Sequence, residues 1–373
     1  MDKTTSQPDS ERKKKHQRPS LRTVAEHVDL SPTAVALALR GDGSIPQETR
    51  QRVIAAAEEL NYEYVPRIKR SAPKRLRRLS YVMPDFGDRP LTANPFYGHL
   101  LVDAEQACQT RHASLNFVVL QREHPPAVEL PPALTHDLDG ILLASPYPVS
   151  LINRIRKESA CPIVLIDHLV PDFSYDAVLN NDCYGARQAT EHLVGLGHTR
   201  ILALTGRTRN PDFPISYKER YRGYCEACAT ANLEVFPPVI VPDHIDERDV
   251  LNPASSAYNE YSAWLRTVFE NTPDATAFFC VGDYFALSLI VTLQAWGYRV
   301  PEDFSVAGFD DFEMSRSANP PLTTVHSNSR AMARIAVQRL LERIDGDETP
   351  PWHISIRPHL VIRTSTGPVP DMI

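Results

Sequence analysis

The sequence predicts a small all-α segment at the N-terminus, followed by a large α/β domain with two lobes. Residues 20 to 62 contain three apolar stripes at helical spacing, and from Leu79 onward strand-like runs alternate with helical stretches. Charge divides in the same place: residues 1 to 78 hold 17 Lys and Arg against 10 Asp and Glu, and the remainder holds 23 against 36. A basic segment joined to an acidic body indicates that the small part meets a polyanion.

Composition narrows the class of protein. The chain has 373 residues, of which 42% are hydrophobic and 23% charged, as in globular proteins of two or three domains. No apolar run approaches the ~20 residues of a membrane span, and the start lacks the apolar region of a signal peptide, so we expect a cytoplasmic protein without membrane contact. Six scattered cysteines are typical of reduced thiols. Cys225 and Cys228 form a CxxC motif within an apparent helix, and no partner CxxC or CxxH lies nearby. We therefore expect both thiols to be buried on one face of that helix rather than to bind zinc or act in redox chemistry.

The all-α segment follows a tail, residues 1–19, for which we expect disorder. Its predicted helices are "LRTVAEHV" (21–28), "SPTAVALAL" (31–39) and "PQETRQRVIAAAEEL" (46–60). Ser31 can cap the second helix, with Pro32 in its first turn and Arg40-Gly41 at its end. Asp29 tolerates the left-handed backbone that the short connection "DL" requires. The first two helices therefore form a helix-turn-helix, and the third provides the surface on which both pack.

The large domain, residues 79–373, shows two sets of alternating elements. The first set has strands in "LSYVMPD", "ASLNFVVLQ", "DGILLAS", "CPIVLIDH" and "DAVLNND", with helices in "GHLLVDAEQACQTR" and "PVSLINRIRKES". The second has strands in "RILALTG", "VIVPD", "ATAFFCVGD", "FSVAGFDD" and "HLVIR", with helices in "YKERYRGYCEACATAN", "YSAWLRTVFENT", "YFALSLIVTLQAWGY" and "SRAMARIAVQRLLERIDG". Alternation predicts two parallel sheets flanked by helices, and ligands bind such sheets beyond the carboxyl ends of their strands.

Residues 21–62 resemble the DNA-binding headpiece of the lac repressor and galactose repressor family. The order and spacing of VAE, S-x-x-x-V, L-R-G, TR-x-x-V and L-N-Y all match. The resemblance implies that the helix beginning at Ser31 lies in the major groove of operator DNA. It implies base contacts by Pro32, Thr33 and Leu37, and contacts to phosphate or the groove wall by Ser20, Arg22, Ser31, Arg40 and Arg50.

Leu37 is where the sequence departs from many relatives. A leucine cannot hydrogen-bond a base edge and offers only apolar contact, for example to a thymine methyl. We therefore expect little direct readout of bases and larger contributions from DNA shape and phosphates. The alternative for Leu37 is an ordinary core leucine.

Residues 63–78 would form the hinge of this family, whose leucine wedges into the minor groove. Pro73 stands where that leucine is expected and would break a helix running from residue 67. A flexible basic linker is the alternative.

The resemblance continues through the large domain, at "NPFYGHLL", "DGILLAS", "EHLVGLGHTRILALTG", "RYRGY", "VGDYFAL", "GYRVPEDFSVAGFDD", "PPLTTV" and "PHLVIRTST". It implies a periplasmic-binding-protein-like effector domain whose interlobe cleft holds Phe96, Tyr97, Ser145, Ser216, Arg220, Asp283 and Asp310. Carboxylates, arginine and aromatic rings suit a hydroxyl-rich, carbohydrate-like effector. Two positions depart from sugar-binding relatives, because Gly282 and Ala144 offer no polar side chain. The alternatives are capping of a helix or turn after a strand for Asp310 and Asp311, and an inter-strand salt bridge for Arg220.

Other classes of protein fit less well. A solute-binding protein needs a signal peptide and no headpiece. For an enzyme, the sequence lacks a P-loop, GxSxG, HExxH and a Gly-rich dinucleotide loop. Asp167 and His168 suggest an acid/base pair, but adjacent strand residues point to opposite faces. We therefore predict a homodimeric repressor of a near-palindromic operator, without catalytic residues, metal or cofactor, and associated with the nucleoid. Control by a protein partner or a non-sugar ligand is the alternative, and the C-terminus shows no leucine heptad for a tetramer.

Overall fold

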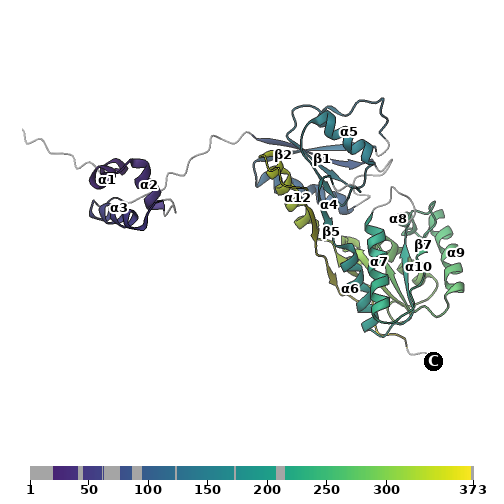
Figure 1. Ribbon diagram of the computed structural model, residues 1–373. Helices are drawn as coiled ribbons and strands as arrows, with labels where there is room; N and C mark the ends of the chain where they lie inside the picture. Colours follow the sequence, from purple (N-terminus) through teal and green to yellow (C-terminus); the bar gives the residue numbers. More distant parts are fainter. Residues whose placement is uncertain are drawn as a thin grey trace, which may run out of the picture. The chain divides into compact units, whose positions relative to one another are not determined.

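The computed structural model describes residues 20–40, 45–60, 62, 76–85, 95–121, 124–171, 174–206 and 215–370. The chain forms two compact units, Met1–Lys74 and Arg75–Ile373 (Figure 1). The predicted tail and residues 63–75 of the predicted linker, including Pro73, lie outside the described residues.

The first unit contains the three predicted helices, α1 (Leu21–Val28), α2 (Pro32–Arg40) and α3 (Gln47–Glu59). Ser20 caps α1, and Asp29 ends it in the left-handed conformation at φ 55°, as the short connection requires. Each helix contributes its apolar stripe to one small core, and Arg52 Nη2 donates to the carbonyl of Val28 at 3.3 Å. The buried residues of this core are Val24, Ala25, Val28, Val35, Ala38, Val53, Ala56 and Ala57.

In the second unit, the first lobe is built on a parallel six-stranded sheet in the order β11-β5-β4-β3-β1-β2. Its strands are β1 (Arg77–Pro84), β2 (Ala113–Leu120), β3 (Gly140–Ala144), β4 (Ile163–Ile166), β5 (Asp176–Asn180) and β11 (His353–Ile356). Helices α4 (Pro95–Gln109) and α12 (Ser329–Ile344) cover one face. Helix α5 (Val149–Ser159) and the 3-10 turn η2 (Pro132–Leu134) cover the other.

The second lobe has a six-stranded sheet in the order β12-β10-β9-β8-β6-β7. Its strands are β6 (Ile201–Thr205), β7 (Val239–Ile240), β8 (Ala277–Cys280), β9 (Ser305–Asp310), β10 (Thr323–His326) and β12 (His359–Val361). Its helices are α6 (Asp182–Gly195), α7 (Ile215–Thr230), α8 (Glu247–Val250), α9 (Ser256–Asn271), α10 (Asp283–Ala295) and α11 (Glu313–Ser317). Strand β12 runs antiparallel to β10, so the expectation of a fully parallel second sheet was wrong at this edge.

The assignment of residues 329–346 to the second set of elements was also wrong. Helix α12 packs against α4 and on strands β3, β4 and β5 of the first lobe, and β11 extends the same sheet (Figure 1). The physical reason is that the chain crosses between the lobes three times. Chain order therefore cannot assign a late helix to a lobe.

The three crossovers lie between β5 and α6, between β10 and α12, and between β11 and β12. Asn180 Nδ2 donates to Ser327 Oγ at 3.4 Å, which links the first two. The amide of Asn181 donates to the carbonyl of Ile356 at 2.8 Å, which links the first and third. The lobes are therefore connected by three short segments that hydrogen-bond to one another.

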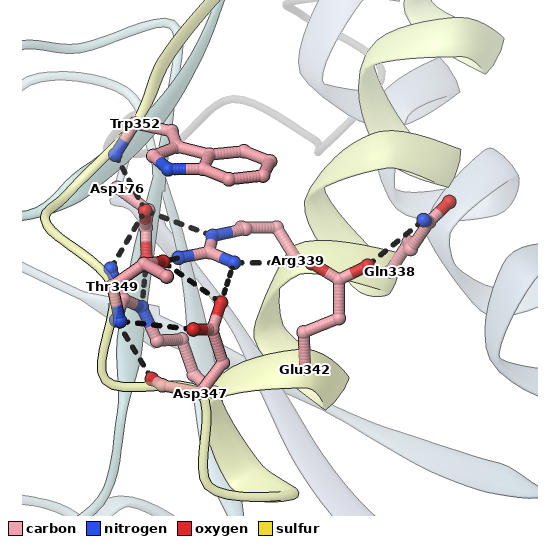
Figure 2. Close-up of polar contacts among 8 residues, drawn as sticks. Asp176, Gln338, Arg339, Glu342, Asp347, Thr349 and Trp352 are labelled. Atoms are coloured by element: carbon pink, nitrogen blue, oxygen red, sulfur yellow. Dashed lines mark hydrogen bonds and ion pairs between the residues drawn. The ribbon is translucent and has the colours of Figure 1, made fainter. Parts of the chain in front are cut away.

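A buried polar network holds α12 to the first lobe (Figure 2). Arg339 is 2% exposed, and its Nε donates to Asp176 Oδ1 at 3.0 Å. The guanidinium also pairs with Asp347 and lies 4.4 Å from the ring centroid of Trp352. Arg343 donates from Nε to Asp176 Oδ2 at 2.6 Å. One carboxylate at the start of β5 thus binds two arginines of α12.

The cysteines of the described residues are free thiols, and Cys225 and Cys228 both lie on α7. Cys228 is buried and Cys225 half-buried, so the predicted helical placement is confirmed. Among the described residues, no helix combines the length and apolar character that crossing a membrane requires.

Candidate functional site

The N-terminal turn of α2 is the most open part of the predicted DNA-reading helix. Ser31, Pro32 and Thr33 are exposed, and Ser31 Oγ accepts the amide of Ala34 at 3.1 Å. The Ser31 hydroxyl therefore caps the helix, as predicted, while its surface stays accessible. An exposed helix N-terminus presents unpaired amides that attract phosphate oxygens.

Leu37 lies on the same helix but outside the core described above. Its side chain is half-buried, and within the described residues it is not one of the apolar side chains packed against that core. Val35 and Ala38 hold α2 in place instead, with Leu39 packed against them. This placement favours the DNA contact over the core alternative for Leu37.

The remaining predicted DNA contacts flank this helix. Ser20 and Arg22 are exposed, and Ser20 Oγ accepts the amide of Thr23 at 3.3 Å. Arg50 on α3 is half-buried. The side chain of Arg40 lies outside the described residues.

A second set of predicted residues meets where the two lobes join. We call Tyr97, Asp167, Asp182, Arg220 and Asp310 the interlobe cluster. Arg220 on α7 is 5% exposed and donates through Nε to Asp182 Oδ1 at 2.9 Å and through Nη1 to the carbonyl of Val281 at 2.6 Å. Its Nη2 pairs with Asp310 Oδ1 at 3.0 Å. The inter-strand salt bridge considered for Arg220 is therefore not observed: Arg220 lies on helix α7, and it pairs within the second lobe with Asp182 of α6 and Asp310 of β9.

The first lobe contributes Tyr97 and Asp167 to the cluster. Tyr97 Oη on α4 donates to Asp167 Oδ2 at 2.8 Å, and both side chains are buried. Burial, followed by the negative charge of Asp182, raises the pKa of Asp167 to about 7. Since Asp182 and Asp310 belong to the second lobe, this carboxyl is electrostatically coupled across the lobe junction.

The cluster lies at the carboxyl ends of parallel strands, where the backbone is strained. Ser145 follows β3, Asp167 follows β4, and Asp310 ends β9, with φ of 75°, 59° and 115°. Residues other than glycine rarely adopt positive φ, and such strain gathers at functional sites. Asp310 binds Arg220 and Asp311 binds Arg363 and Arg316, whereas α11 has no side-chain cap. Side-chain capping of α11, the helix form of the capping alternative for both aspartates, is therefore not observed.

The remaining predicted effector residues are not members of the interlobe cluster. Ser145 and Ser216 are buried, and Phe96 is half-buried with its ring edge-on to Tyr97 at 5.2 Å between centroids. Asp283 is fully buried and accepts hydrogen bonds from Thr324 Oγ1 (2.5 Å), Ser315 Oγ (2.6 Å) and the amide of Phe312 (2.9 Å). Its carboxylate thus holds the loop after β9 in place.

Sequence reasoning missed Asp167 and Asp182. Strand β4 ends at Ile166, so the argument that Asp167 and His168 alternate across a strand does not apply to them. Asp182 is the first residue of α6, directly after a crossover that the sequence pattern did not reveal. The resemblance identified Asp310, which is the last residue of a buried strand, and Asp167 directly follows another buried strand, so an acid at the end of such a strand is a signal that could have found Asp167.

A helix-turn-helix followed by two α/β lobes with a buried polar cluster between them defines the class of DNA-binding regulators with a periplasmic-binding-protein-like domain. Two family models match the chain in agreement with this class. Residues 20–64 match the family of bacterial regulatory proteins, lacI family, and residues 190–366 match the periplasmic binding protein-like domain. The chain belongs to the lac repressor and galactose repressor family of transcriptional regulators.

Individual relatives cover nearly the whole chain. The HTH-type transcriptional repressor PurR of Aliivibrio fischeri (strain MJ11) is 28% identical over 93% of this chain and 98% of its own. The HTH-type transcriptional regulator CelR of Thermobifida fusca is 27% identical over 94% of this chain and 99% of its own. A solved structure of a CelR–cellobiose complex is 27% identical, with a TM-score of 0.65, and covers 93% of this chain and 100% of that one.

Proposed function

We propose that this protein is a cytoplasmic, nucleoid-associated repressor that binds a near-palindromic operator as a homodimer. A small effector between the lobes would control it, without catalysis, metal or cofactor. The observation that carries this proposal is the interlobe cluster, in which Tyr97 and Asp167 of one lobe face Arg220 and Asp310 of the other. A ligand bound there contacts both lobes and thereby changes the angle between them.

DNA recognition would use α2 for bases and the surrounding basic residues for phosphates. Thr33 is the one hydrogen-bonding side chain among Pro32, Thr33 and Leu37, so direct readout is sparse. Affinity for the operator should then fall steeply with salt, with a log–log slope of roughly −0.9 for each neutralised phosphate.

The effector proposed from the family is carbohydrate-like. The buried carboxylates accept hydrogen bonds from hydroxyl groups, and Tyr97 and Phe96 bring aromatic rings to the same junction. A CelR structure holds cellobiose, which supports a sugar as the class of ligand.

Two exposed apolar surfaces of the second unit support the dimer. On edge strand β2, Phe117 and Val119 are 37% and 42% exposed, and Val102 on neighbouring α4 is 57% exposed. In the second lobe, a groove between α8, α10 and α11 includes Met314, which is 45% exposed, beside the buried Leu287 and Ile290. The polar residues Gln294, Ser317 and Asn319 also line this groove. Neighbouring exposed apolar side chains are a feature of protein interfaces, and a second copy buries the same patch on both partners.

Selection of bound DNA from a random pool, with and without a sugar library, tests the proposal. We expect a near-palindromic site with one half-site for each headpiece, and a change in its affinity with at least one sugar. Selection of a palindrome whose affinity no small molecule alters would favour the second candidate, the same regulator controlled by a protein partner. Failure to enrich any sequence would contradict the proposed function.

A further inference from the structure

The interlobe cluster has more negative charge than its own arginine can balance. Asp167, Asp182 and Asp310 are 6%, 6% and 13% exposed, and Arg220 is the cation that interacts with all three among the described residues. When all three carboxyls are ionised, two negative charges remain. Glu219 and Asp283 add negative charge next to Asp182 and Asp310. Buried charge without a partner is costly, so this junction favours a positively charged partner.

Hydrogen-bond acceptors are also in surplus there. Arg220 already donates from each of its three nitrogens. Asp167 receives one hydrogen bond, from Tyr97, and the Asp310 carboxylate is bonded through Oδ1 alone among the described residues. A ligand at this junction must therefore bring donors.

Asn180 gives an independent indication of the same kind. It is 6% exposed, and its Nδ2 donates to Asp182 Oδ1 at 3.1 Å, which fixes the orientation of the amide. Its Oδ1 is buried and has no hydrogen-bond partner in the described part of the chain. An unpaired buried acceptor beside Asp182 costs free energy that a donor would recover.

The titration behaviour agrees with these contacts. Burial is the largest cause that raises the pKa of Asp167 to about 7 and that of Asp310 to about 6, and the charge of Asp182 raises both further. The unliganded junction therefore retains protons near neutral pH. A bound cation would replace them.

Resting on the effector role proposed above, we propose that the effector is a cation rich in hydrogen-bond donors, and that an amino sugar is the simplest class that fits. One ammonium group brings three donors and a positive charge to Asp167, Asp310 and Asn180. The hydroxyl groups of the sugar supply the remaining donors.

Calorimetry and thermal unfolding of the full-length protein with matched sugars test the charge requirement. The probes are D-glucosamine, D-glucose and D-glucuronate, and the corresponding galactose series. We expect the amine to bind at least tenfold more tightly than its neutral partner, and the acid not at all. If a neutral or acidic member binds as tightly as the amine, the inference fails while the proposed effector domain stands.

If none of these sugars binds, the charge surplus itself is measured with Asp167→Asn in the unliganded protein. A raised pKa means that ionised Asp167 costs stability, and this cost grows as pH rises from about 4 to about 7. We expect Asp167→Asn to raise Tm at pH 8, with a smaller gain at pH 5. The matched control is Asp311→Asn, since Arg363, Arg316 and His326 surround that carboxylate and its loss should lower Tm. A lower or unchanged Tm for Asp167→Asn at pH 8 would overturn the inference.

Discussion

Single residues of the first unit decide both its stability and its specificity. Asp29 adopts φ 55° in the turn between α1 and α2, where glycine is tolerated without strain. Leu37 on α2 has no hydrogen-bonding group in its side chain and lies outside the headpiece core. Asp29 allows the tight turn between α1 and α2, and Leu37 limits the hydrogen bonds that α2 can make to DNA bases.

Asp29→Gly should stabilise the first unit by about 0.5 to 1 kcal/mol, because it removes the steric cost of the left-handed conformation. Hydrogen exchange of the α1 and α2 amides in the full-length protein measures this free energy. The control is Asp29→Ala, which should be destabilising by about 1 kcal/mol because alanine tolerates positive φ less well than aspartate. Slower exchange in the alanine variant than in the wild type would contradict the turn geometry.

Leu37→Ala should weaken specific operator binding about fivefold, equivalent to about 1 kcal/mol of lost apolar contact. Nonspecific DNA affinity should not change, since phosphate contacts carry it. Titration of the selected operator and of a scrambled duplex, at one salt concentration, separates the two. Ile54→Ala, which also truncates an exposed aliphatic side chain, is the control and should leave both affinities unchanged.

At the scale of elements, two contacts stabilise the second unit: the close packing of α6 on α7, and the packing of α12, near the end of the chain, on the first lobe. Helices α6 and α7 approach so closely that a Cβ on Gly223 would lie 2.2 Å from the Cys183 carbonyl oxygen. Helix α12 reaches back to the first lobe, where Arg339 binds Asp176 (Figure 2). Arg343 binds the same carboxylate. Neither contact can be predicted from the spacing of apolar residues, because one depends on a glycine and the other on a buried ion pair.

Gly223→Ala should lower the free energy of unfolding by about 3 kcal/mol, because either α6 or α7 must shift to admit the methyl group. Gly195→Ala is the matched control, since nothing lies within 4 Å of the added Cβ and its φ is not positive. It should be neutral or stabilising by up to about 1 kcal/mol through helix propensity. Urea unfolding measures both variants, and equal values for the two would contradict the close packing.

For the whole molecule, assembly decides whether two headpieces act on one operator. A dimer turns the second half-site contact into an intramolecular event, which raises affinity without any new contact. The apolar groove that contains Met314, itself 45% exposed, is the part of the second lobe best suited to this interface.

Met314→Asp should convert the dimer to a monomer at micromolar concentration, because a carboxylate would be buried twice in a symmetric interface. Operator affinity should fall more than tenfold as a result. Sedimentation velocity and operator titration measure the two effects. Val235→Asp places the same charge on another exposed apolar residue and should leave the dimer intact. If Met314→Asp remains dimeric, the groove is not the interface.

The sequence by itself determined the three helices of the first unit, the strands of both lobes except β10 and β11, and the family. Local pattern suffices there, because capping, helical spacing and strand alternation depend on neighbours in the chain. The family resemblance also predicted Tyr97, Arg220 and Asp310 as cleft residues, and these three side chains lie where the lobes join. Only the tertiary structure added Asp167, Asp182 and Asn180, and only it assigned α12 and β11 to the first lobe. The physical reason is that charge balance and lobe membership depend on three crossovers that bring distant segments together, and no local pattern records them.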